Sequence, residues 1–475
     1  MTVARRVLGA VASGVSVVAA FPAAAAVDAP HIDGAVLGLW WAVPFAGILL
    51  SIAIMPLVAP AFWHHHFGKV SAAWAVAFIV PAVIIFGLPV AAYELLHTLL
   101  LEYVPFIVLL WALFTVAGGI RLVGDLRSSP ATNTAMLAIG TVLASWMGTT
   151  GAAMLMIRPL IRANAWRKNQ AHVMVFLIFL VANIGGALTP IGDPPLFLGF
   201  LKGVPFFWPT TALLVPMLLI AAMLLVIFFA LDTYLFSREP SGPPDDRTGE
   251  RLGVEGGVNI LLLGAIVGAV LLRGIWHSGV DIIVYHVPVP LESIASNLLL
   301  VAIGMLSLRL TTQDTRAGNA FSWGPIVEVA KLFAGIFITI VPMIAILRAG
   351  RDGALAGLVA MVTTPDGRPI DAWYFWLTGI LSSFLDNAPT YLVFYNLAGG
   401  DAVQLTGSLA TTLMAISAGA VFMGANTYIG NAPNFMVKAI AEERGVRMPS
   451  FFGYMAWACI FLLPLFALST LVFFL

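Results

Sequence analysis

The sequence of 475 residues has a single cysteine, Cys459, which excludes an internal disulfide and any metal cluster built from cysteines. Charged residues make up only 10% of the chain, and the formal net charge is zero. Because no excess of positive charge is present, we expect no nucleic-acid partner. The sequence contains no phosphate-binding loop and no H-E-x-x-H metal motif. We therefore predict that the protein is not an enzyme and uses no cofactor.

Apolar residues are abundant instead, at 60% of the chain with a mean hydropathy of +0.99. Apolar runs of about 20 residues, the length that crosses a bilayer, recur throughout. This composition predicts an all-α polytopic membrane protein whose main partner is the lipid bilayer. Residues 1–26 combine Arg5 and Arg6 with an apolar stretch and an alanine-rich end. That layout fits a cleavable signal peptide or an uncleaved anchor helix, and both remain open.

The apolar runs are of two kinds. Continuous spans are expected near residues 36–56, 71–91, 104–122, 209–235, 257–276, 293–310, 325–347 and 451–474. Segments near 133–157 and 371–398 are interrupted by GTTG and by DNAP. Each half of the first segment has about a dozen residues, which is too few to cross a bilayer. We therefore predict that each of the two segments is a re-entrant hairpin. Glu94, His97 and Glu102 are expected to be solvated in a short outer connection.

Two further runs, near 172–201 and 408–441, contain related polar motifs. TPIGDPPLF at 189–197 and TYIGNAPNF at 427–435 share the pattern T-x-I-G-[D/N]-x-P-x-F, 238 residues apart. Paired apolar segments interrupted by Gly and Pro mark the binding site of transporters built from inverted repeats. We therefore predict two broken helices, a first repeat at 36–235, a polar linker at 236–255 and a second repeat at 256–475.

The distribution of Lys and Arg indicates an orientation. Most loop Lys and Arg residues fall on one side when the first span after the signal runs inward, and that side is expected to be cytoplasmic. The linker is then cytoplasmic, and the first repeat begins outside whereas the second begins inside. We expect a multi-pass protein of a bacterial-type inner membrane, with the mature N-terminus and the C-terminus outside.

Asp193 and Asp386 are the candidate ligands for a metal cation, because a charged side chain at mid-membrane costs at least ~2.5 kcal/mol and is retained mostly for function. Asp386 also fits an N-cap, and Asp193 a simple turn. A kinked structural helix is the alternative at either motif. The other candidate ion- or substrate-binding residues offer neutral oxygens, amides or free backbone: Thr149, Thr150, Gly151, Asn183, Thr189, Gly192, Asn387, Thr390, Asn426, Thr427, Gly430 and Asn431.

The two T-x-I-G motifs, SSFLDNAPT at 382–390 and PFIVLLWALFTVAGG at 105–119 resemble the ion transporter superfamily. This superfamily includes NhaD-type sodium/proton antiporters, citrate transporters, arsenite permeases and divalent-anion/sodium symporters. The resemblance runs from about residue 36 to the C-terminus. It implies a homodimer in which a transport part moves like an elevator against a scaffold part. It also implies a site made from the hairpin tips and the unwound helices.

Two readings of the substrate stay open. Two mid-membrane acids without a mid-membrane arginine favour a secondary active transporter that exchanges Na⁺ for H⁺. A sodium- or proton-coupled carrier of citrate, dicarboxylates or another anion is the alternative, because neutral donors and helix N-termini can bind a carboxylate. The expected coupling ion is Na⁺, H⁺ or both. A channel would need no coupling carboxylate, and an enzyme would need a nucleophile or metal set that the sequence lacks.

Overall fold

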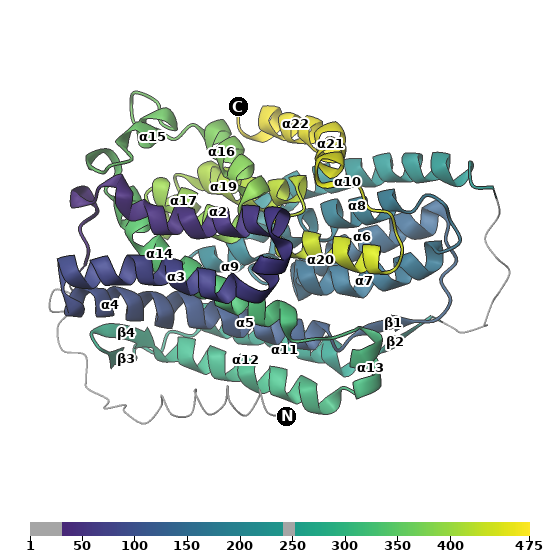
Figure 1. Cartoon of the computed structure of the whole chain (residues 1–475), viewed down its shortest axis with the longest axis horizontal. Coiled ribbons are helices and arrows are strands. Elements are labelled where there is room, and N and C mark those ends of the chain that lie inside the picture. Colours follow the sequence, from purple (N-terminus) through teal and green to yellow (C-terminus); the bar gives the residue numbers. More distant parts are fainter. Residues whose placement is uncertain (1–30, 241–251) are drawn as a thin grey trace.

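The computed structural model describes residues 31–240 and 252–475, and these residues are overwhelmingly helical (Figure 1). The candidate signal or anchor at 1–26 and residues 241–251 of the linker lie outside the described residues. In a bilayer every backbone N–H and C=O must find a partner within the protein, and an apolar helix satisfies this need along its whole length. The prediction of an all-α polytopic membrane protein is confirmed.

Nine helical stretches in the described ranges are long and apolar enough to cross a membrane. They are Leu39–Val58 (η2 Leu39–Ala42 and α2 Val43–Val58), α3 (Pro60–Phe86), Leu88–Ala117 (α4 Leu88–Thr98, the π-helical η3 Leu99–Tyr103 and α5 Val104–Ala117), Ala171–Leu188, α10 (Trp208–Phe236), α11 (Val258–Ile275), α12 (Leu291–Leu310), α14 (Gly324–Arg348) and Phe451–Phe473 (α21 Phe451–Phe461 and α22 Leu463–Phe473). The short helices include η1 (Gly34–Val36), α13 (Gln313–Gly318), η5 (Gly350–Asp352), α15 (Ala356–Met361) and α18 (Ala402–Thr406).

The expectation of a solvated connection around Glu94, His97 and Glu102 is wrong. The chain turns at Gly87 and then runs as one helical stretch from Leu88 to Ala117. Glu102 is only 6% exposed and pairs with Lys202, while Glu94 accepts hydrogen bonds from the His31 ring and from the backbone N–H of Ile32. These carboxylates have partners from distant parts of the chain, so the helix can include them.

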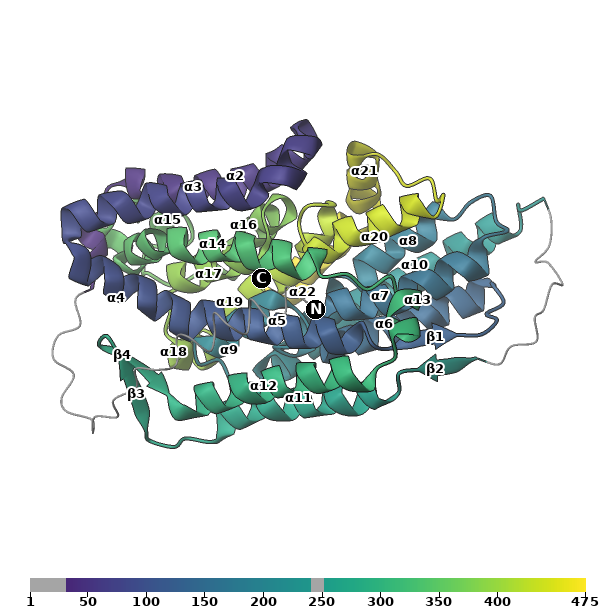
Figure 2. The same cartoon turned by 60° about the horizontal axis from the view of Figure 1, so that its bottom comes forward.

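Two helix–turn–helix pairs occupy the segments expected to be hairpins. The first consists of α6 (Pro130–Met147) and α7 (Thr149–Asn164), which meet at Gly148. The second consists of α16 (Asp371–Phe384) and α17 (Asn387–Leu397). Figures 1 and 2 show α6 and α7 toward one end of the long axis and α17 toward the other, so the two turns approach each other in the middle of the molecule.

The helices that contain the two related motifs are interrupted in the same way. In the first half α8 (Ala171–Leu180) is followed by η4 (Ile184–Leu188) and α9 (Pro194–Leu201). In the second half α19 (Ala410–Met423) is followed by η6 (Gly424–Asn426) and α20 (Ala432–Glu443). Proline in the first turn of α9 and α20 is favourable, because a missing N–H costs nothing there.

Two small antiparallel ribbons were not predicted. β1 (Arg121–Val123) pairs with β2 (Gly253–Glu255), and β3 (Asp281–Val284) pairs with β4 (Val287–Pro290). The ribbons lie at opposite ends of the long axis (Figures 1 and 2).

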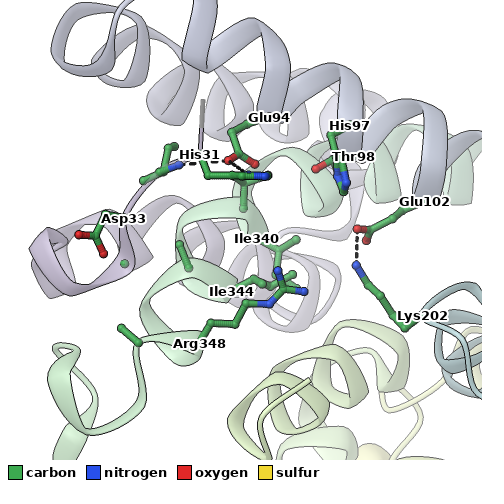
Figure 3. Close-up of a pocket in the computed structure, with 15 residues that line it drawn as sticks. His31, Asp33, Glu94, His97, Thr98, Glu102, Lys202, Ile340, Ile344 and Arg348 are labelled. Atoms are coloured by element: carbon green, nitrogen blue, oxygen red, sulfur yellow. Dashed lines mark hydrogen bonds and ion pairs between the residues drawn. The ribbon is translucent and has the colours of Figure 1, made fainter. Parts of the chain in front are cut away.

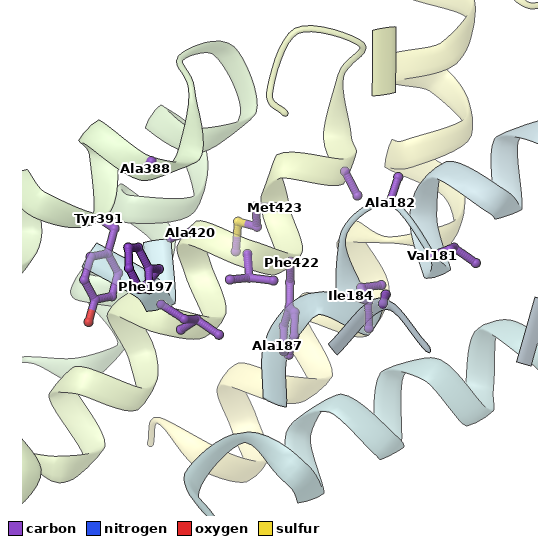
Figure 4. Close-up of a cluster of buried hydrophobic side chains, with 14 of the residues drawn as sticks. Val181, Ala182, Ile184, Ala187, Phe197, Ala388, Tyr391, Ala420, Phe422 and Met423 are labelled. Carbon is purple, nitrogen blue, oxygen red and sulfur yellow. The ribbon is translucent and has the colours of Figure 1, made fainter. Parts of the chain in front are cut away.

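The interrupted helices lie in the core of the protein. Every residue from Val173 to Ala182 is fully buried, and Figure 4 shows Val181, Ile184 and Ala187 in one apolar region with Phe422 and Met423 of α19. Helices α3 and α11 expose large apolar side chains instead, such as Ile84 at 76% and Leu261 at 75%. This distribution matches outer helices that contact lipid and inner helices that hold a polar site.

Candidate functional site

Asp193 is the residue on which the site converges. It precedes α9 with an extended backbone, and its side chain does not cap that helix. The carboxylate accepts hydrogen bonds from Thr149 Oγ1 at 3.1 Å, Asn387 Nδ2 at 2.6 Å and Asn431 Nδ2 at 3.3 Å. Asp193 is 1% exposed. One buried carboxylate therefore joins the turns of both helix pairs to both interrupted helices.

The three donors to Asp193 are all neutral. The hydrogen bonds and ion pairs found among the described residues include no Lys, Arg or His at this carboxylate. Four helices, α7, α9, α17 and α20, begin at or next to the site, and their N-termini carry partial positive charge. The site thus compensates a negative charge with dipoles rather than with a fixed cation.

Asn387 supplies an additional polar atom. Its Nδ2 is used by Asp193, but its Oδ1 is buried and has no hydrogen-bond partner in the described part of the chain. Buried amide oxygens nearly always have partners in folded proteins. An oxygen of this kind beside a carboxylate is a candidate ligand for a hard cation, which prefers oxygen ligands.

The same hydrogen bond occurs in both halves of the chain, 238 residues apart. Thr189 Oγ1 donates to the backbone oxygen of Ser145, and Thr427 Oγ1 donates to that of Ser383. Each threonine thereby attaches its interrupted helix to the neighbouring helix–turn–helix pair. Ser145 is a residue that the sequence reasoning missed, although the 238-residue spacing from Ser383 would have identified it.

Glycine is required where the interrupted segments fold back on themselves. A β-carbon on Gly192 would collide with the backbone oxygen of Gly186, and one on Gly430 would lie 2.5 Å from that of Gly424. The backbone oxygen of Gly192 also accepts a hydrogen bond from Thr149 N at 2.9 Å. Gly192 and Gly430, both predicted site residues, therefore allow close contacts between backbone segments.

A cluster of buried amides supports the site. Asn183 Nδ2 donates to Asn434 Oδ1 at 2.7 Å, and Asn431 Nδ2 lies 3.2 Å from Asn183 Oδ1. Asn434 donates in turn to the backbone oxygens of Gly424 and Thr427. These bonds fix the two interrupted helices relative to each other.

Asp386, Thr390 and Asn426 have hydrogen-bond partners other than the Asp193 carboxylate. Asp386 is half-buried, and its Oδ1 accepts from Ala388 N at 3.0 Å, so it caps α17. Thr390 donates to the backbone oxygen of Asp386. Asn426 Nδ2 donates to Ser383 Oγ, which places this side chain beside the second turn. The capping role expected as an alternative for Asp386 is present.

A cavity of about 120 Å³ adjoins the site. Thr149, Thr150 and Asp193 line its polar side, and apolar residues of α5 and α14 line the opposite side. Gly151 permits α7 to approach α5, because a β-carbon there would lie 2.7 Å from that of Ala117. Open space therefore reaches the carboxylate where α7 faces α5 and α14. A larger cavity of about 410 Å³, lined by Glu94, Glu102, Lys202 and Arg348 among others, lies away from Asp193 (Figure 3).

Apolar helices of spanning length around a polar site at paired helix interruptions define a multi-pass membrane transporter. A family with the description "Putative citrate transport" matches residues 34–474, and the chain belongs to this family. The family is part of the citrate transporter-like ion transporter superfamily, so the resemblance seen in the sequence is confirmed. Uncharacterized transporters of Mycobacterium bovis and Mycobacterium tuberculosis are each 26% identical over 329 residues, covering 67% of this chain and 71% of theirs.

Proposed function

We propose that the protein exchanges Na⁺, or a similar small cation, for H⁺ across a bacterial inner membrane. The observation behind this proposal is the environment of Asp193, a buried carboxylate whose hydrogen-bond donors in the described structure are all neutral. A carboxylate in this setting gains from binding either a metal cation or a proton. Antiport requires at least one site that binds the metal cation and the proton alternately.

In the proposed cycle Asp193 loses its proton and then binds Na⁺. Asn387 Oδ1 and the Thr149 hydroxyl are the neutral oxygens placed to complete the coordination. Asp386, at the second turn, adds a negative charge near the site. After Na⁺ leaves, a proton neutralises Asp193 for the return step. Because Na⁺ and H⁺ compete for the same oxygens, their exchange is coupled.

The resemblance to the superfamily supports two further parts of the proposal. The helices that hold the site, α6 to α9 and α16 to α20, would form a transport part that moves like an elevator. Helices α2 to α5, α11, α12 and α14 would form the scaffold part, through which two copies assemble as a homodimer. We also propose that the two halves are inverted repeats and that both helix–turn–helix pairs are re-entrant.

A coupled carrier of citrate or another carboxylate is the second candidate. Two observations favour it: the description of the matching family, and the four helix N-termini that point their partial positive charge at the site. In that case Asp193 would hold the coupling Na⁺ or H⁺, and the neutral donors at the turns would hold the carboxylate.

Proteoliposomes with an imposed pH gradient and a pH-sensitive dye distinguish the candidates. NaCl, LiCl and KCl are added in turn, followed by choline citrate and choline succinate. We expect Na⁺ or Li⁺ to collapse the gradient and Asp193→Asn to abolish the response. Asp281→Asn is the matched control, because Asp281 is exposed on β3.

The outcomes are exclusive. Wild-type exchange in Asp193→Asn would overturn the proposed role of this carboxylate. A response to citrate or succinate without a response to cations would replace antiport by carboxylate transport. A melting temperature for Asp193→Asn close to that of the wild type shows that the loss is not caused by unfolding.

A further inference from the structure

One face of α17 leads from the site toward the end of the helix that contacts Arg348, a residue of the larger cavity. Asn387, Tyr391 and Tyr395 are spaced four residues apart, so their side chains lie along the same side of the helix. At 1.5 Å per residue they extend over about 12 Å of the helix axis. Asn387 is the residue that donates to Asp193, and the stripe therefore begins at the proposed ion site.

Tyr391 is packed in the middle of this stripe. It is 1% exposed, and its hydroxyl lies directly against Gly199 of α9, where a β-carbon would collide with it. Figure 4 shows Tyr391 beside Phe197 of α9 and near Ala420 of α19. The phenol thus lies between the two interrupted helices, one turn away from Asn387.

Tyr395 continues the stripe away from the site. Its ring stacks on that of Tyr391 with centroids 5.8 Å apart and an interplanar angle of 27°. Tyr395 is fully buried. Arg348 donates to Asn396 of α17 at 3.0 Å and lines the cavity of about 410 Å³ in Figure 3. The residue that follows Tyr395 therefore contacts an arginine of the cavity wall.

The Tyr395 hydroxyl is the unusual feature of the stripe. Tyr395 Oη is buried and has no hydrogen-bond partner within residues 31–240 and 252–475. Leaving a hydroxyl unpaired in an apolar interior costs free energy, on the order of 1–3 kcal/mol in protein mutational data. Phenylalanine would keep the stacked rings without that cost. Packing of the Tyr391 and Tyr395 rings therefore does not explain why Tyr395 has a hydroxyl.

We propose that the hydroxyls of Tyr391 and Tyr395 conduct protons between the larger cavity and Asp193. This inference rests on the proposed antiport. A phenol accepts a proton from water on one side and releases its own proton to water on the other. One O–H bond forms as another breaks, no electron is transferred, and the tyrosine is neutral before and after. Water is the co-reactant, and the cavity is its supply.

The test separates proton movement from movement of the carrier. Net Na⁺/H⁺ antiport is followed with a pH-sensitive dye, and exchange of labelled for unlabelled Na⁺ is followed at equal pH on both sides. Exchange needs the loaded carrier to move but needs no proton. We expect Tyr391→Phe and Tyr395→Phe to reduce net antiport at least tenfold while exchange stays within twofold of the wild type. Tyr103→Phe is the control, because the Tyr103 hydroxyl already bonds the backbone oxygen of Ala330.

Three results would overturn the inference. Equal loss of antiport and exchange would mean that the tyrosines only support the structure. Unchanged antiport in both variants would mean that protons take another route. If the wild type moves Na⁺ without protons, the proposed antiport fails and the proton route fails with it. Melting temperatures of the variants identify any loss that comes from unfolding.

Discussion

Asn387 makes the shortest of the three side-chain hydrogen bonds to Asp193, at 2.6 Å. A hydrogen bond to a charged group contributes about 1.5–3 kcal/mol, and 1.4 kcal/mol corresponds to a factor of ten in an equilibrium constant. Removing this donor by Asn387→Ala destabilises the ionised carboxylate relative to the protonated one. We expect the half-saturating Na⁺ concentration at pH 7 to rise tenfold or more, and the pH profile of antiport to move to higher pH.

The dye assay at a series of Na⁺ concentrations and pH values measures both effects. Asn169→Ala is the control, because Asn169 is exposed and far from Asp193 in the chain. A pH profile of Asn387→Ala that coincides with that of the wild type would show that Asn387 does not stabilise the ionised form.

Asp232 is the centre of a second buried polar cluster. Its Oδ1 lies 2.6 Å from Arg167 Nη1 and 2.7 Å from His172 Nε2, and its Oδ2 accepts from Asn133 at 2.9 Å. Asp232→Ala leaves the buried Arg167 with only Glu239, whose Oε1 lies 3.9 Å from Arg167 Nε. Removing one partner of a buried ion pair costs about 3–5 kcal/mol in proteins. We expect a marked fall in the melting temperature of the detergent-solubilised protein.

A surface ion pair provides the comparison for this prediction. Arg121 and Glu255 are 3.3 Å apart, with side chains that are 30% and 43% exposed. Because exposed ion pairs contribute about 0–1 kcal/mol, Glu255→Gln should change the melting temperature little. Similar melting temperatures for the two variants would show that the Asp232 cluster does not stabilise the fold.

The turn between α6 and α7 depends on one glycine. Gly148 has φ +80° and ψ 145°, a backbone conformation that is accessible essentially to glycine alone. Gly148→Ala should therefore cost about 1–3 kcal/mol and displace Thr149 from Asp193. We expect both a lower melting temperature and slower transport.

Gly268→Ala is the matched control for the turn. Gly268 lies inside α11 and a β-carbon there meets nothing within 4 Å, so alanine should stabilise that helix by about 0.5–1 kcal/mol. If Gly148→Ala keeps wild-type stability and transport, the turn tolerates a side chain and the backbone geometry does not limit function.

Local signals in the sequence account for much of the helical arrangement. Glycine, proline and polar residues in apolar runs coincide with the ends of α7 at Gly148, of α9 at Asp193 and of α17 at Asp386. The helix through Glu94 and Glu102 could not be predicted, because its carboxylates are satisfied by His31 and Lys202, which are distant in the chain. The ribbon of β1 and β2 also depends on a pairing between distant residues.

The residue types of the site could be read from the sequence, but their partners could not. Asp193 and Asp386 are both acids beside a helix N-terminus, yet Asp386 caps its own helix whereas Asp193 accepts from three other elements. That difference depends on side-chain orientation, which is set by packing between α9, α17 and α20. The amide cluster of Asn183 and Asn434 joins residues 251 positions apart and is equally invisible in a local motif.

For the molecule as a whole, the contact between the proposed transport and scaffold parts is the property that matters most. Lys202 follows α9 in the transport part and pairs with Glu102 on the scaffold helix, and both side chains are mostly buried. Arg348 of α14 donates to Asn396 of α17 in the same region (Figure 3 shows Arg348 and the ion pair). An elevator movement must break these contacts in every cycle.

Linking the two parts covalently at this ion pair should therefore stop transport. In Glu102→Cys/Lys202→Cys, with Cys459→Ser to remove the chain's native thiol, we expect a short bifunctional methanethiosulfonate reagent to abolish exchange of labelled Na⁺. Reduction should restore it. Arg121→Cys/Glu255→Cys is the control, because these residues are paired across β1 and β2, which follow α5 and precede α11 of the scaffold part. Mass spectrometry shows whether the two introduced thiols at positions 102 and 202 are completely cross-linked. If exchange is then undiminished, the two parts do not move relative to each other at this contact. Equal inhibition in the control would mean that the reagent acts without regard to that movement.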